Sequence, residues 1–140
     1  MRGVTFYLTN NGDLYGCGAG GYGAQGGEDY KDVLTFTKKA ENVKDFDCSS
    51  GATWYITNNN DLYGCGRGNY GQQGSGTTTA VLPFTKRAEN VKYVDCTPST
   101  TFYIDNNNDL YGCGYNAYGQ QGNGTTTNVL TFTKVELPKE

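Results

Sequence analysis

An uninterrupted 48-residue repeat constrains the fold of this chain more than any other feature. The hexapeptide DLYGCG occurs at 13–18, 61–66 and 109–114, so each copy begins 48 residues after the one before (61 − 13 and 109 − 61). The segment VLTFTK at 33–38 returns as VLPFTK at 81–86 and as VLTFTK at 129–134, with the same step. No insertion or deletion breaks the register. Repeats of this length are typical of solenoids, propellers and other arrays.

The 140 residues hold slightly under three copies and are expected to form one repeat domain. The units run from 1 to 18 (partial), 19 to 66, 67 to 114 and 115 to 140 (partial). The segment NVKxxDC occurs at 42–48 and 90–96, and the copy expected after Lys134 is absent.

One unit, residues 42–90, predicts three or four short strands. Residues 42–48 alternate polar and apolar side chains, and 53–57 (TWYIT) are rich in β-branched and aromatic residues. The Asn-rich segment 58–61 predicts a hairpin turn before a third strand at 62–66, because Asn and Asp tolerate a positive φ. A long glycine-rich loop at 67–79 then leads to a fourth extended segment, in which Pro83 indicates a strand edge or a bend. We therefore expect an all-β fold of propeller blades.

Composition narrows the class of protein further. A net charge of −3 with 14% aromatic residues argues against disorder, and it gives no electrostatic reason to bind nucleic acid or an anionic membrane. Neither a signal peptide nor an apolar run long enough to span a bilayer is evident. A cytoplasmic location is the resulting expectation, and free cysteines agree with it.

Three motifs in fixed order resemble the RCC1 (regulator of chromosome condensation) repeat family. The glycine-rich loops GRGNYGQQGSG at 66–76 and GYNAYGQQGNG at 114–124 are similar to the family loop G-x-N-x-x-G-Q-L-G-x-G, and 18–27 is a degenerate copy. The segments FDCSSGATWYIT at 46–57 and VDCTPSTTFYID at 94–105 resemble the strand V-A-C-G-x-x-H-T-x-A-L-T. The family His is replaced by Ala52 and Thr100, and the Trp of its Trp-Gly pair by Cys17, Cys65 and Cys113.

The resemblance implies about three blades of an RCC1-like β-propeller. Propellers close with about four to eight blades, so three blades form an open arc with an apolar face at each end. We expect oligomerisation to complete the ring, as a homodimer that closes six blades, or else the chain to be a fragment of a longer propeller.

Catalysis, metals and cofactors find little support in the sequence. The chain has no His, so a Ser-His or Cys-His pair is impossible. Its five Cys occupy two repeat positions, which predicts buried thiols and no disulfide framework or metal site. The Asn-rich turns lack the acidic ligands of a calcium loop, and GRGNYG at 66–71 matches a nucleotide motif without opening a helix. We predict no enzymatic activity, no cofactor and no metal.

The preferred function is a protein–protein interaction scaffold that acts through the Gly/Tyr-rich loops. Two alternatives remain open: an exchange factor-like regulator of a small GTPase, by analogy with the founding family member, and a carbohydrate-binding propeller. Residues that break the repeat symmetry, or that place Tyr in a loop, are the candidates for partner binding: Tyr22, Glu28, Asp29, Tyr30, Arg67, Asn69, Tyr70, Tyr115, Asn116 and Tyr118.

Overall fold

The computed structural model describes residues 3–27 and 29–138, and this part of the chain contains eleven β-strands and no helix. The strands are β1 (Val4–Leu8), β2 (Leu14–Gly18), β3 (Val33–Ala40), β4 (Val43–Cys48), β5 (Ala52–Thr57), β6 (Leu62–Gly66), β7 (Val81–Ala88), β8 (Val91–Cys96), β9 (Thr100–Asp105), β10 (Leu110–Gly114) and β11 (Val129–Lys134).

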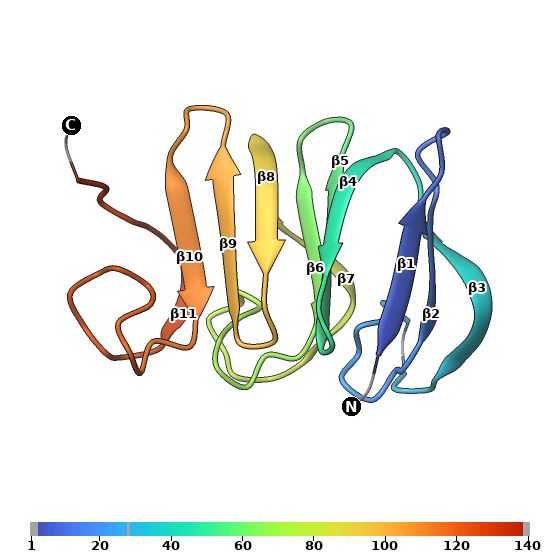
Figure 1. Ribbon diagram of the computed structural model, residues 1–140, viewed down its shortest axis with the longest axis horizontal. Helices are drawn as coiled ribbons and strands as arrows, with labels where there is room; N and C mark the ends of the chain where they lie inside the picture. Colours follow the sequence, from blue (N-terminus) through green and yellow to red (C-terminus); the bar gives the residue numbers. More distant parts are fainter. Residues whose placement is uncertain (1–2, 28, 139–140) are drawn as a thin grey trace.

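These strands form three antiparallel meanders that stand side by side in chain order (Figure 1). The first sheet is β1-β2-β3, the second is β4-β5-β6-β7 and the third is β8-β9-β10-β11. Equivalent residues pair in the same register, as Phe6 with Gly16 and Trp54 with Gly64. The sheets are therefore copies of one unit, and within the described residues the first lacks a counterpart of β4 and β8. The predicted all-β architecture of blades is confirmed.

The hairpin turns follow from the chemistry of Asn and Gly. Asn60 and Asn108 have φ values of 69° and 66°, and Gly12 occupies the equivalent position with 86°. The Asn60 N–H donates to the Thr57 carbonyl oxygen at 2.9 Å, which closes the turn. These residues reach a positive φ at low cost, so the predicted hairpins form at 10–13, 58–61 and 106–109.

Apolar side chains project from both faces of the second sheet, because each face is covered by a neighbouring sheet. On β5, the fully buried Trp54 and Ile56 pack against the third sheet, whereas Tyr55 between them packs against Phe6 of the first. Gly64 faces the Trp54 ring, where a Cβ atom would overlap it. Consecutive apolar residues, instead of strict alternation, are thus the signature of a strand between two sheets.

The loops separate into two ends of the molecule. The Asn turns lie at one end, and the glycine-rich loops that join β2 to β3, β6 to β7 and β10 to β11 gather at the other (Figure 1). Pro83 lies in β7, an edge strand of the second sheet, as predicted. Among the residues that the structure describes, no helix has the length and apolarity needed to cross a membrane.

Candidate functional site

A buried glutamine holds the backbone of each glycine-rich loop. Gln73 Nε2 donates to the carbonyl oxygens of Cys65 at 3.0 Å and Arg67 at 3.3 Å. Gln25 and Gln121 make the equivalent pairs of bonds in the first and third loops. Because the amide joins the loop to the end of the preceding strand and to the first loop residue, it fixes the path of the loop that carries the exposed residues.

Five of the predicted binding residues form one strip across the three loops, which we call the rim strip: Tyr22, Arg67, Tyr70, Tyr115 and Tyr118. The guanidinium carbon of Arg67 lies 4.9 Å from the ring centroid of Tyr22 and 5.9 Å from that of Tyr70. The Tyr70 ring meets Tyr115 edge to face at 4.8 Å, and Tyr118 follows at 6.3 Å. Tyr22 and Tyr118 are exposed and the other three are half-buried. The result is an aromatic surface with one cation between two rings, a contact worth about 0.5–1 kcal/mol at an exposed site.

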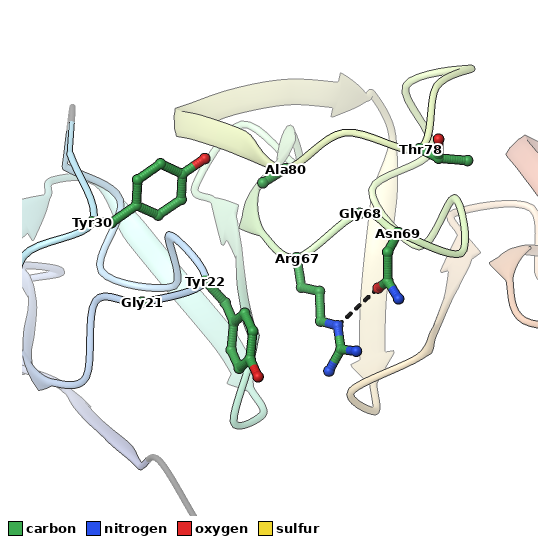
Figure 2. A pocket seen from close by; sticks show the side chains of 8 residues that line it. All are labelled: Gly21, Tyr22, Tyr30, Arg67, Gly68, Asn69, Thr78 and Ala80. Carbon is green, nitrogen blue, oxygen red and sulfur yellow. Dashed lines mark hydrogen bonds between the residues drawn. The ribbon is translucent and has the colours of Figure 1, made fainter.

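An open hollow of about 440 Å³ adjoins Arg67 between the first and second loops (Figure 2). Arg67 and Tyr22 extend side by side from different loops, and Tyr30 stands on the far side of the hollow (Figure 2). Arg67 Nε donates to Asn69 Oδ1 at 2.8 Å, which orients the guanidinium group. Its other N–H groups have no hydrogen-bond partner within 3–27 and 29–138, so they are available to an acceptor from a partner. The lining residues are Gly21, Tyr22, Tyr30, Arg67, Gly68, Asn69, Thr78 and Ala80.

The remaining candidates of the first loop lie at the edge of this site. Tyr30 is 52% exposed and lines the hollow. Asp29 is exposed, and its Oδ1 accepts a hydrogen bond from the Lys31 N–H at 3.1 Å. Glu28 lies outside the described residues.

Asn116 is fully buried and does not lie on the exposed surface, contrary to its predicted role in partner binding. Its Nδ2 donates to the carbonyl oxygens of Thr125 and Thr127 at 3.1 and 2.8 Å, and its Oδ1 accepts from the Gln121 N–H at 2.9 Å. The Asn116 N–H donates to Asn128 Oδ1 at 2.9 Å. Its amide therefore braces the third loop from within, because the loop curls around it.

The acidic residues at repeat positions have partners within the fold. Asp13, Asp61 and Asp109 pair with Lys38, Lys86 and Lys134 at 3.3, 3.5 and 3.5 Å respectively. In the interior, Asp47 Oδ2 accepts the Cys96 N–H at 2.8 Å and so ties the second sheet to the third. Each of these carboxylates already has a partner within the fold.

The five cysteines are free, and Cys65 and Cys113 are fully buried. Burial raises the pKa of both thiols well above its ordinary value, so they stay protonated at neutral pH. No cluster of three or more His, Cys, Asp or Glu side chains with the spacing of a metal site occurs among the described residues.

The sequence interpretation missed the glutamines of the loops. Gln72 is fully buried, and its Nε2 donates to the Pro98 carbonyl oxygen of the third sheet at 2.9 Å. Gln25, Gln73 and Gln121 stand at one repeat position, and a polar residue kept in all three copies was the available signal of an internal role.

Comparison with known proteins agrees with this architecture. The family model described as the regulator of chromosome condensation (RCC1) repeat matches residues 91–120. No curated protein matches the sequence.

Several solved structures have the same arrangement of strands. Prp20p from Saccharomyces cerevisiae is similar with a TM-score of 0.84 and 21% identity, over 96% of this chain and 36% of that chain. A structure of Kap60 bound to yeast RCC1 (Prp20) gives 0.81 and 19%, over 94% and 35%. Human WBSCR16 gives 0.79 and 20%, over 94% and 35%. The chain spans about a third of the length of these neighbours.

The repeat match and the structural likeness converge on one description. Three sheets, each one repeat unit, stand face to face as in the RCC1 and Prp20 structures. Residues 91–120 match the RCC1 repeat model, and the three sheets have the fold of blades of an RCC1-like β-propeller.

Proposed function

We propose that this chain is a protein-interaction scaffold that binds a protein partner through the rim strip and the adjoining hollow. The observation that carries the proposal is Arg67, which lies between Tyr22 and Tyr70 and lines the hollow. Of its N–H groups, only that of Nε has a hydrogen-bond partner among the described residues. Tyr and Arg are enriched among residues that dominate binding energy, because they give large contact area at low entropic cost.

The structural neighbours support a protein partner. One was solved with Kap60 bound to yeast RCC1, and the work on Prp20p concerns its binding to Gsp1p and histones. Those partners belong to the neighbours, whose chains are about three times longer than the matched part. They support the class of partner and not its identity.

Substitution of Arg67 by Ala tests the proposal. Ala is the residue of the first loop at this position, Ala19, so the backbone is expected to accept it. The control is Lys92→Ala, which removes the same charge near the Asn turns, at the other end of the sheets (Figure 1). Proteins captured from cell extract by the wild-type chain are identified by mass spectrometry, purified and titrated calorimetrically.

We expect a captured partner to bind Lys92→Ala as it binds the wild type, and to bind Arg67→Ala at least about tenfold more weakly, which corresponds to about 1.4 kcal/mol. Equal affinity for all three proteins would contradict a role of the rim strip. Separate assays test the two alternative functions. Faster release of nucleotide from a small GTPase would favour the exchange factor-like function, and a signal on a glycan array that disappears in Tyr70→Ala would favour carbohydrate binding.

The completion of the propeller is a further part of this proposal. Two copies of three blades give six, which falls within the range of about four to eight at which propellers close. The alternative is that further blades of a longer chain complete the ring.

A further inference from the structure

The two junctions inside the chain are built from equivalent residues. In the first, Phe6, Leu14 and Ala40 of one sheet meet Val43, Tyr55 and Phe84 of the next. In the second, residues 48 positions later take the same places: Trp54, Leu62 and Ala88 meet Val91, Tyr103 and Phe132. The two junctions therefore show, in two copies, which residues pack against each face of a blade.

The outward face of the third sheet, the C-terminal face, carries the next copy of the first set. Phe102, Ile104 and Leu110 are the counterparts of Trp54, Ile56 and Leu62, and they line an apolar hollow of about 230 Å³. Trp54, Ile56 and Leu62 are fully buried, whereas their three counterparts are half-buried. This face therefore has the apolar residues that one sheet contributes to a junction, without a second sheet packed against them.

The outward face of the first sheet, the N-terminal face, carries two members of the opposite set, Tyr7 and Phe36; the Val43 and Val91 position belongs to the strand that this sheet lacks within the described residues. Tyr7 stacks on Tyr15 at 5.3 Å and meets Phe36 edge to face at 5.0 Å. The corresponding pairs inside the junctions measure 5.1 and 4.8 Å for Tyr55, and 4.8 and 4.8 Å for Tyr103. Tyr7 is 44% exposed, against 8% for both Tyr55 and Tyr103. The aromatic group is already arranged as in a closed junction, so docking needs little reorganisation.

The edges of the two faces match in the same way. Leu82 of the second sheet lies over Gly23 of the first loop, and Leu130 lies over Gly71 of the second loop. The next members of this series are Leu34, which is 90% exposed, and Gly119.

A polar contact belongs to the same series. Thr53 Oγ1 donates to the Ala24 carbonyl oxygen at 2.8 Å, and Thr101 Oγ1 to that of Gln72 at 2.8 Å. The next members of the series are the exposed Thr5 and the carbonyl oxygen of Gln120, which make no such contact within the described residues.

We propose that the C-terminal face of one copy of this chain binds the N-terminal face of a second copy, in a head-to-tail contact that repeats the aromatic, leucine and threonine contacts of the internal junctions. Leu34 lies against Gly119, Phe36 approaches Phe102, and Thr5 donates to the Gln120 carbonyl oxygen. Contacts of this kind join different surfaces, so they close into a ring or continue into open chains. The inference rests on the proposed completion by a second copy and specifies the two surfaces; it is independent of the rim strip.

The experiment uses one variant on each face. Leu34→Arg places a charge at a side chain that is 90% exposed within the chain, so folding is preserved. Gln120→Arg places a charge on the other face, where Gln120 is exposed and its Oε1 accepts the N–H of the exposed Tyr118 at 2.9 Å, whereas its counterpart Gln72 is fully buried at a junction. Masses are measured by size-exclusion chromatography with light scattering over a dilution series.

We expect the wild type to form a species of twice 15.2 kDa. Each variant should dissociate at least about a hundredfold more readily, because the interface would bury an unpaired charge. An equimolar mixture of the two variants should form a dimer again, since one intact C-terminal face then meets one intact N-terminal face.

The outcomes separate the two ideas. A wild type of 15.2 kDa at every concentration overturns assembly by a second copy and leaves further blades of a longer chain as the occupant. A wild-type dimer that mixing fails to restore overturns the head-to-tail contact alone, because it indicates that like faces pair.

Discussion

Replacement of Thr53 by Val tests how one blade is bound to the next. The Thr53 hydroxyl and the Ala24 carbonyl oxygen that it contacts are both buried, so no water replaces the lost donor. Loss of one partner from a buried hydrogen bond costs about 1–3 kcal/mol. For a chain of this size that corresponds to a fall in Tm of roughly 3–9 °C, at about 3 °C for each kcal/mol.

The repeat supplies matched controls for this measurement. Thr101→Val removes the same bond at the second junction and should show a similar loss. The third equivalent, Thr5, is exposed and has no hydrogen-bond partner within the described residues, so Thr5→Val should change stability by less than about 0.5 kcal/mol. Unfolding is followed by circular dichroism at a concentration where light scattering shows a single chain. A loss at Thr5→Val as large as at Thr53→Val would refute the assignment of the cost to the junction.

Three further changes probe other parts of the structure. Asn116→Ala should lower the free energy of unfolding by about 2–4 kcal/mol, because the Gln121 N–H and several loop carbonyls lose a buried partner. Urea titration measures this change, and a value below about 0.5 kcal/mol would contradict the bracing role. Cys65 and Cys113 should be alkylated by iodoacetamide only on unfolding, since burial both covers these thiols and raises their pKa. Mass spectrometry locates the label, and rapid labelling of the folded chain would disprove their burial. Asp95 is exposed, but the desolvation of its carboxyl by neighbouring residues, followed by the adjacent Asp47 carboxyl, raises its pKa. The folded chain therefore binds this proton more tightly than the unfolded chain, and stability falls as pH rises through that pKa. Asp95→Asn should therefore raise Tm at pH 7, and the gain should shrink as the pH is lowered toward about 4; a gain that does not vary with pH would count against this cause.

The sequence was sufficient to predict the strands and turns because each had a local cause. The Asn turns and the glycines at 64 and 66 determine the backbone conformation of residues next to them, and the repeat then predicts the same elements 48 residues later. The strands and turns of the structure lie at these positions. Asn116 and the loop glutamines were not predictable in this way. A polar side chain in a loop is ordinarily exposed, and whether the loop curls around it depends on contacts with residues up to 12 positions away.

The rim strip lies between these two cases. Its members were recognisable as symmetry-breaking or exposed residues, but their contact was not, because Tyr22, Arg67 and Tyr115 come from different loops. Only the face-to-face stacking of the sheets brings them into one line.

The middle sheet, β4 to β7, is covered on both faces, whereas each outer sheet is covered on one. In a stack of this kind, stability is shared between neighbours, and the units at the ends open at lower free energy than the centre. Amide protons of β5 and β6 would therefore exchange with solvent last, and those of β1 and β10 much earlier. A contact between the two outer faces would turn end units into interior ones, so assembly and resistance to local opening would rise together.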